Sequence, residues 1–249
     1  VLLTGYMLAS TPMMSRLLTQ LAKLANTAPK AILLVTFVSL LASWINWGFG
    51  LVIGALFAKA IARHTLVDYR LLVASAYSGF IVWHGGLAGS IPLTIATSGH
   101  FSQQSIGVIN TSETLFSGFN IAIVIGLFII MPLVNRYMLP SAKDSIYVDK
   151  TLLAEPIPKP NNVTRPADKI EHSKLLGLGI GVLGLVYLAN YFVFSGGSLN
   201  LNSVIALFLF SAILLHQTPY NLLNSLQQAV PSGAGIIIQF PFYAGIMAI

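Results

Sequence analysis

The stretch Ala31–Ala58 holds 28 residues without one Asp, Glu, Lys or Arg, and it is flanked directly by Lys30 and Lys59. A straight helix of this length would extend ~42 Å at ~1.5 Å per residue, which exceeds the ~30 Å hydrocarbon core of a bilayer. Two complete crossings would need about 40 residues. Because Lys and Arg collect on the cytoplasmic side of a membrane, both ends of the stretch are expected there. These constraints predict a re-entrant helical hairpin that turns near Ser43–Gly50.

The composition is that of an integral membrane protein. The chain is 55% hydrophobic and 8% charged, whereas soluble domains average about 25% charged residues. Leu175–Ile249 runs for 75 residues without a charge. The net charge of +6 comes from basic residues in loops between apolar runs, a pattern that sets membrane topology. The expected partner is therefore the lipid bilayer and not nucleic acid, and the absence of cysteine excludes disulfides and thiolate metal sites.

A second long apolar stretch, Leu71–Ser98, is interrupted twice. His84–Gly86 and Gly89–Pro92 place glycine and proline at mid-span, which predicts a discontinuous helix. Thr114–Asn135 then reads as an uninterrupted span that returns to the basic side. Glu113 stands just before this span, where a carboxylate suits the positive end of a helix, so we expect it to act as a cap.

The segment 140–174 differs in kind, because it holds eleven of the chain's twenty charges and five of its twelve prolines. It is expected to be a partly extended cytoplasmic linker between two halves. Beyond it, 175–194 and 203–217 read as two spans, and 219–230 reads as a helix in the membrane interface. The last apolar run, 235–249, then heads outward again.

The directions of these segments predict inverted-topology repeats. Residues 1–139 would form a first, partial repeat, and 175–249 would begin a second repeat that is cut before its own hairpin. Because the sequence starts and stops inside apolar runs, we expect it to be an internal segment of a longer transporter. The predicted fold class is an all-α polytopic membrane protein with inverted repeats, a re-entrant hairpin and a discontinuous helix.

The two interruptions are also the predicted binding site. Irregular backbone at membrane depth is tolerated where protein or a water-filled cavity satisfies it, and carriers hold substrate in such places. Asn46 lies at the inferred turn, where free N–H groups at a helix start attract anions. The alternatives are that Asn46 only caps a helix and that Gly85 and Gly89 only allow close helix packing. The candidate residues for substrate or ion binding are Ser43, Asn46, Trp47, Gly48, Gly85, Gly86, Gly89 and Ser90.

Other motifs point away from enzyme chemistry. Gly179–Gly184 matches a dinucleotide-binding pattern, but it lacks a preceding strand and a following acidic residue, so it is interpreted as a helix-packing face. His84 is interpreted as a packed neutral side chain or a proton relay. The remaining histidines show no metal-ligand spacing, and no Ser, His and acid combine as a nucleophilic triad. No catalytic residue, metal or organic cofactor is predicted.

Three strings closely resemble the bacterial short-chain fatty acid transporter family: Ile45–Val52, Thr114–Ile121 and Gln239–Ile246. The similarity runs in order across essentially all 249 residues. The resemblance implies an ion-transporter-like fold with inverted repeats and two hairpins, and import of acetoacetate, butyrate and similar carboxylates across the inner membrane. Pro231–Gly235 looks like a run in the family's second hairpin but falls too early in the chain. His84 stands where some members have glycine.

The leading hypothesis is a multi-pass secondary transporter that imports short monocarboxylates across the bacterial inner membrane. The coupling ion, Na⁺ or H⁺, stays open, as does assembly into a homo-oligomer. A carrier for a dicarboxylate or another small anion is the first rival, and the expected absence of Lys and Arg from every span argues against it. The second rival is a membrane-embedded acyl-group enzyme, for which Ser90 and His84 would be the nucleophile and base without a third, orienting group.

Overall fold

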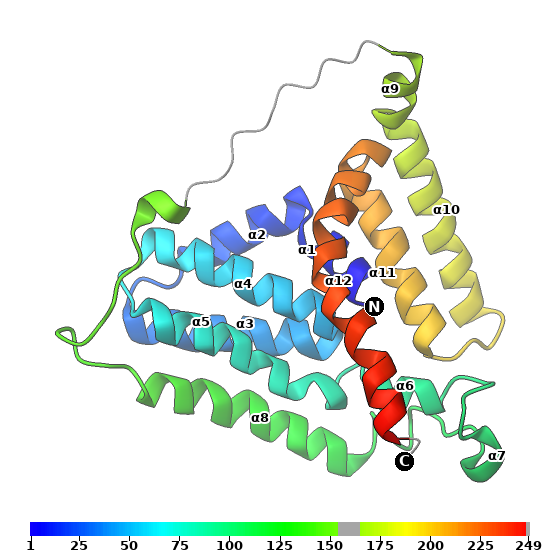
Figure 1. Ribbon diagram of the computed structural model, residues 1–249, viewed down its shortest axis with the longest axis horizontal. Coiled ribbons are helices and arrows are strands. Elements are labelled where there is room, and N and C mark those ends of the chain that lie inside the picture. Colours follow the sequence, from blue (N-terminus) through cyan, green and yellow to red (C-terminus); the bar gives the residue numbers. More distant parts are fainter. Residues whose placement is uncertain (154–164, 248–249) are drawn as a thin grey trace.

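The computed structural model describes residues 1–153 and 165–247, and within these ranges it contains helices and no β-strand. The first group of helices comprises α1 (Leu2–Ala9), α2 (Pro12–Ala22), α3 (Ala28–Ile45), α4 (Trp47–His64), α5 (Tyr69–Ser78), the 3₁₀ helix η1 (Gly79–Gly85), α6 (Ser90–Ile95), α7 (Gln103–Ile106) and α8 (Gly118–Tyr137). The 3₁₀ helix η2 (Lys150–Leu153) follows and packs on α4 of this first group. The second group comprises α9 (Pro166–Glu171), α10 (Lys174–Val193), α11 (Leu201–His216) and α12 (Pro219–Met247). In Figure 1, α2, α4, α5 and α8 run alongside one another, while α10 and α11 stand steeply against them.

Helices α3 and α4 form a helical hairpin, and Asn46 alone connects them. That this hairpin is re-entrant stays a prediction. The Oδ1 of Asn46 accepts the N–H of Phe49 at 3.0 Å, so one side chain ends α3 and begins α4. The turn is therefore shorter than predicted, since Ser43 lies inside α3 and Trp47 and Gly48 lie inside α4. Both helices also extend beyond the uncharged stretch, because capping by Thr27 and packing of the last turns of α4 stabilise them further. As a result, Lys59 lies within α4.

Close packing of small residues holds the hairpin together. Gly50 lies so near Ser43 that a Cβ at this position would collide with the backbone of α3. The Ser39 hydroxyl donates to the carbonyl of Ala76, which ties α3 to α5. Four large side chains of the hairpin are fully buried: Ile32, Leu40, Phe57 and Ile61. The hairpin is thus the packing centre of the first group of helices.

The predicted discontinuous helix is confirmed. Asp68 caps the start of α5, accepting the N–H of Leu71 at 2.9 Å. The α-helix then tightens into the 3₁₀ helix η1, the chain leaves helical geometry between Gly86 and Gly89, and α6 begins at Ser90. The glycines predicted to break the span are the residues at which the helix stops.

Helix α8 starts at Gly118, later than predicted, because the Ser117 hydroxyl caps it by accepting the N–H of Asn120 at 3.3 Å. The expectation that Glu113 caps this helix was wrong, since Glu113 is exposed and lies in the preceding turns. Near the other end of α8, Asn135 donates hydrogen bonds to Thr36 of α3 and Ser78 of α5.

The described part of the predicted linker is partly folded onto the first group. The Ile146 N–H donates to Asp68 at 2.7 Å. The side chain of Leu153 is buried, and its carbonyl oxygen accepts a hydrogen bond from Nε of Arg63 at 3.0 Å. Packing against α4 and α5 therefore competes with an extended conformation here. The prolines at 156, 158 and 160 lie outside the described residues.

In the second group, α10 packs on α11 through Gly181 and Gly184, as the packing interpretation of Gly179–Gly184 predicts, but Gly179 takes no part, since a Cβ there would meet nothing within 4 Å. A Cβ on Gly181 would lie 2.8 Å from the Cα of Leu214, and Gly184 lies directly against the ring of Phe210. Such close approach of helix backbones is typical of small residues in membrane helices. The predicted interfacial helix and the last apolar run are joined in α12, which bends by 47° between Pro231 and Gly233.

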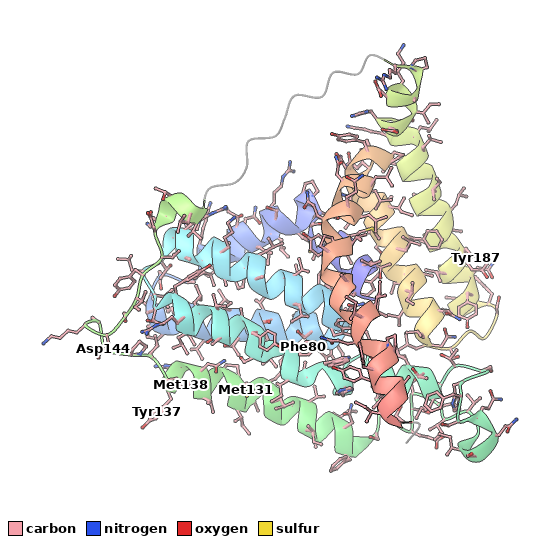
Figure 2. The ribbon with its side chains drawn as sticks, in the orientation of Figure 1. Phe80, Met131, Tyr137, Met138, Asp144 and Tyr187 are labelled. Carbon is pink, nitrogen blue, oxygen red and sulfur yellow. The ribbon has the colours of Figure 1, made fainter. Side chains whose placement is uncertain are left out.

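The outer surface of the helices is apolar, as expected for contact with lipid. Four helical segments in the described chain are long and apolar enough to cross a membrane, and the bent α12 would be a fifth; the four are Ala28–Ile45, Tyr69–Ile95, Gly118–Tyr137 and Lys174–Val193. Tyr187 is 68% exposed on α10, and Figure 2 shows it among side chains on the outside of the bundle. At the end of α8, Tyr137 points away from the other helices. The protein is therefore a polytopic helical membrane protein.

Candidate functional site

The structure brings the tip of the hairpin and the break in the discontinuous helix together. The N–H of Leu87 donates to the carbonyl oxygen of Trp44 at 2.7 Å. The neighbouring Gly86 is buried so closely against Trp44 that any Cβ there would collide with the same carbonyl. The two interruptions that sequence reasoning singled out therefore lie in contact. Residues 43–48 and 83–90 together are called the junction below.

Several polar groups of the hairpin tip are buried and have no hydrogen-bond partner. Asn46 is 0% exposed and its Nδ2 donates to nothing in the described chain. The hydroxyl of Ser43, 1% exposed, is also unpaired. Trp47 and Gly48 open α4, and neither backbone N–H has an acceptor among the described residues. Because an unsatisfied buried polar group costs about 1–3 kcal/mol, such a concentration of free donors points to a ligand.

The glycines of the predicted site have different surroundings. Gly48 packs on Leu2, where a Cβ would lie 2.7 Å from Cα. Gly85 faces Asn120, whose Nδ2 donates to the Gly85 carbonyl at 3.1 Å. Gly89 packs on the carbonyl of His84, within its own segment.

Ser90 is the predicted site residue with the weakest link to the tip. It begins α6, is half-buried, and has no hydrogen bond to the hairpin within the described chain. The tip itself is closed in this conformation, because α1 covers it: a Cβ on Gly5 would lie 2.9 Å from the Oδ1 of Asn46. A ligand would need α1 or the hairpin to move before it could reach Asn46.

Aromatic rings line one side of the junction. The rings of Trp47 and Trp83 lie 5.5 Å apart, those of Phe80 and Trp83 lie 4.9 Å apart, and His84 stacks on Trp83 at 4.1 Å. The indole N–H of Trp83 is buried without an acceptor. Sequence reasoning did not select Trp83, although its position directly before His84–Gly86 was a usable signal. An apolar wall with unpaired N–H groups suits a small amphipathic anion.

The junction carries no formal charge, since residues 43–50 and 83–90 contain no Asp, Glu, Lys or Arg. In residues 1–153 and 165–247, no three His, Asp or Glu side chains gather in a way that could hold a metal ion. The electrostatics at the tip therefore come from N–H dipoles and from the positive end of α4. Dipoles of this kind favour a single negative charge.

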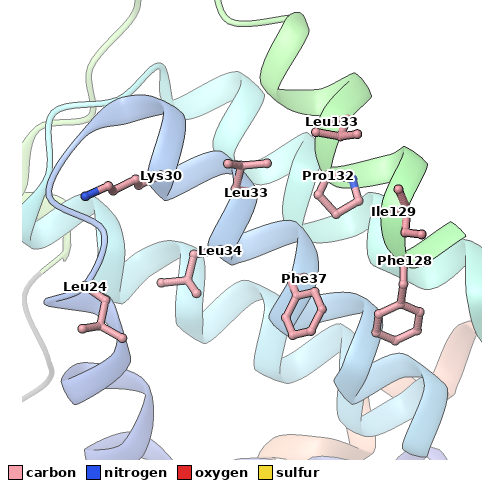
Figure 3. A pocket seen from close by; sticks show the side chains of 9 residues that line it. All are labelled: Leu24, Lys30, Leu33, Leu34, Phe37, Phe128, Ile129, Pro132 and Leu133. Carbon is pink, nitrogen blue, oxygen red and sulfur yellow. The ribbon is translucent and has the colours of Figure 1, made fainter. Parts of the chain in front are cut away.

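Four cavities described in the protein lie away from the junction residues. Figure 3 shows one of about 460 Å³ between α3 and α8, apolar throughout except for Lys30 at one end. Phe37 and Phe128 line it, and their rings meet edge to face at 5.6 Å. It is open and lies on the lipid-facing side of α8, so we interpret it as a crevice on the membrane surface. The others are bordered by Lys59, by His216 and by Tyr191 respectively.

Comparison with known proteins agrees with the helical membrane architecture and names its class. The family model described as "Short chain fatty acid transporter" matches residues 1–249, so the chain belongs to this transporter family. A protein of Escherichia coli (strain K12) is 42% identical over 250 residues, which cover 99% of this chain and 57% of the relative. A protein of Haemophilus influenzae is 40% identical over 258 residues, which cover 99% of this chain and 58% of the relative.

Both relatives carry the name "Putative short-chain fatty acid transporter". The chain spans a little over half of their length, 57% and 58% respectively. No solved structure matches the chain. The family confirms the resemblance seen in the sequence and favours transport over catalysis.

Proposed function

We propose that the protein is part of a secondary transporter that imports short monocarboxylates, such as acetoacetate and butyrate, across the bacterial inner membrane. The observation that carries this proposal is the set of buried, unpaired donors where two helix breaks meet. Membership of the short-chain fatty acid transporter family supports the substrate class. Coupling to Na⁺ or H⁺, inverted repeats and a homo-oligomeric state are parts of the same proposal.

In the proposed binding mode, the carboxylate accepts hydrogen bonds from Asn46 Nδ2 and from the N–H groups of Trp47 and Gly48. The Nδ2 of Asn46 is buried without a partner, and the two N–H groups lie at the positive end of α4, which makes this set suitable for a negative charge. The short apolar tail then lies against the rings of Trp47 and Trp83, which are 5.5 Å apart. The rest of the proposed binding site is formed by Ser43, Gly86 and Ser90.

Transport in this proposal requires the hairpin to move as a unit against the surrounding helices, by rocking or by an elevator-type displacement. The internal packing of the hairpin through Gly50 and Ser43 supports movement as a unit. Hydrogen bonds also tie α3 to Ala76 of α5 and to Asn135 of α8, so either these contacts break or α5 and α8 move with the hairpin. In contrast, Gly5 of α1 covers the tip and must separate from it to open the site.

A dicarboxylate carrier is the closest alternative. The expected absence of Lys and Arg from every span argues against it, although α4 continues beyond the uncharged stretch and includes Lys59 and Arg63. At the junction itself, however, no cation is available for a second carboxylate. A monocarboxylate therefore remains the better fit to the tip. An acyl-group enzyme is disfavoured because His84 is exposed and stacked on Trp83, and no hydrogen bond links it to Ser90 in the described chain.

The test is uptake of labelled butyrate by the full-length protein in proteoliposomes under imposed Na⁺ or H⁺ gradients. We expect gradient-driven accumulation that unlabelled acetoacetate inhibits and succinate leaves unchanged. Inhibition by succinate at the same concentrations as butyrate would favour the dicarboxylate alternative. Release of a covalently altered product would contradict a transport function.

A further inference from the structure

A polar cavity borders α4 from Val52 to Arg63, on the part of the hairpin that leads away from the junction. It measures about 450 Å³ and is enclosed by α1, α2, α4 and α12, which meet in the middle of Figure 1. Its wall combines apolar and polar side chains: Tyr6, Ala9, Ser10, Ser15, Leu18, Val52, Leu56, Lys59, Ala60, Arg63 and Gln228. The volume is in the usual range for small-molecule sites, roughly 300–1,000 Å³. The neighbouring helices thus leave room for a ligand beside α4.

Two basic side chains, Lys59 and Arg63, line this cavity, and no Asp or Glu among the described residues lines it. Arg63 is held in place by the carbonyl of Leu153, to which its Nε donates at 3.0 Å. Lys59 is half-buried and makes no hydrogen bond or ion pair with any described residue. A partly desolvated, unpaired ammonium group in a cavity is a binding group for an anion.

The remaining wall suits an anion with a short apolar tail. Tyr6 lines the same cavity, and its hydroxyl has no hydrogen-bond partner in the described chain. Val52 and Leu56 provide apolar surface on the same helix. Lys59 lies twelve residues beyond Trp47 within α4, which corresponds to roughly 18 Å along the helix axis at ~1.5 Å per residue. Lys59 therefore lies well away from the junction, whereas the cavity wall reaches Val52, five residues beyond Trp47.

From this arrangement we propose that the cavity around Lys59 is a second binding site for short carboxylates, on the side of the membrane that carries the basic loops. Its ligand class rests on the proposed function, and its location does not. Lys59 and Tyr6 bind the carboxylate, and the tail lies on Val52 and Leu56. The site would hold substrate before or after it occupies the junction, so the transporter would contain two carboxylate sites along one helix.

The test is protection of Lys59 from acetylation in the purified full-length protein, measured by peptide mass spectrometry with N-hydroxysuccinimide acetate. Butyrate should slow acetylation of Lys59 about tenfold once its concentration is ~10-fold above its Kd, because the free fraction of a site falls as 1/(1 + [L]/Kd). The exposed Lys23 is the internal control and should react at an unchanged rate. Butyramide, which is neutral and has nearly the same shape, should give no protection, and chloride keeps the ionic strength constant.

Protection should persist in the Asn46→Asp variant, since the two sites are separate. Loss of protection in that variant would show that Lys59 only reports the junction, and would overturn the second site. Equal effects of butyrate and butyramide, or no effect of either, would also overturn it. Protection without any butyrate uptake would support the Lys59 site and contradict the proposed transport. Uptake without protection would support the proposed transport and contradict the Lys59 site.

Discussion

The backbone N–H of Leu87 donates to the carbonyl oxygen of Trp44, and this 2.7 Å hydrogen bond joins the two helix breaks of the first helical group. Trp44 lies near the end of α3, where carbonyl groups lack partners within the helix. Leu87 lies in the non-helical segment between η1 and α6, where N–H groups lack them as well. Each break therefore satisfies part of the backbone of the other, and both hold their position beside Asn46.

Gly86→Ala tests whether this contact is needed. A Cβ at Gly86 would collide with the Trp44 carbonyl, so the substitution must push the second break away from the hairpin tip. We expect loss of butyrate uptake in the full-length protein at normal membrane abundance. Gly126→Ala in α8 is the matched control, because nothing lies within 4 Å of a Cβ there and Ala is the better helix former by up to about 1 kcal/mol. Equal uptake by the two variants would contradict the account of the junction.

Trp47→Ala should alter the preference for chain length. If the tail lies against Trp47, the variant loses apolar contact worth about 0.8 kcal/mol per buried CH₂, or roughly fourfold in affinity for each methylene. Inhibition constants of acetate, propionate and butyrate should therefore converge in the variant. Phe37→Ala, in the apolar crevice between α3 and α8, should leave the series unchanged. A parallel loss of affinity for all three acids would remove Trp47 from the tail site.

The positions of the helix breaks could be predicted from the sequence, because their causes are local. Glycine and proline interrupt the second apolar stretch, and Asn46 is the one residue of Ala31–Ala58 with a side chain that both caps a helix and tolerates the turn. The same reasoning misplaced the start of α8. Glu113 and Ser117 are both acceptable caps by residue type, and the hydrogen bonds of the turn 111–117 place Ser117 directly before the helix.

Long-range packing accounts for what the sequence did not indicate. The linker was expected to be extended because of its charges, yet Ile146 and Leu153 fold back onto Asp68 and Arg63. The indole N–H of Trp83 is buried without a partner because of how neighbouring helices pack. The cavity around Lys59 likewise depends on packing between distant helices, since α12 contributes to its wall. No local pattern records these contacts. The length of the hairpin was also underestimated from the charge-free stretch, because helix α4 continues beyond Lys59.

Asp68→Asn tests the attachment of the linker and has a defined pH dependence. Burial alone would raise the pKa of Asp68, but hydrogen bonds from Arg70, Ile146 and Leu71 outweigh it and lower the pKa from 3.8 to about 2. The ionised carboxylate therefore stabilises the fold fully above pH 3.8, and this contribution is lost as the pH falls towards 2.

Thermal unfolding of the detergent-solubilised protein is the measurement for Asp68→Asn. At pH 7 the variant should be less stable by about 1–3 kcal/mol, because the side chain that accepts the N–H groups of Leu71 and Ile146 loses its charge and one of its two oxygens. The difference from the wild type should shrink at acidic pH near the lowered pKa. Glu113→Gln, which changes an exposed carboxylate, should stay within about 0.5 kcal/mol of the wild type. A pH-independent difference would contradict the role given to the ionised form of Asp68.

The central claim, that Asn46 binds the carboxylate, is tested most directly by the half-saturation concentration for butyrate uptake in the Asn46→Asp variant, normalised to folded protein in the membrane. Asp keeps the oxygen that caps α4 and removes the unpaired Nδ2 donor, whereas Asn46→Ala removes both. Loss of a hydrogen bond to a charged ligand costs about 1.5–3 kcal/mol, so the account predicts a rise of roughly 10- to 150-fold in both variants. A wild-type half-saturation concentration in Asn46→Asp would contradict it and leave Asn46 as a helix cap alone.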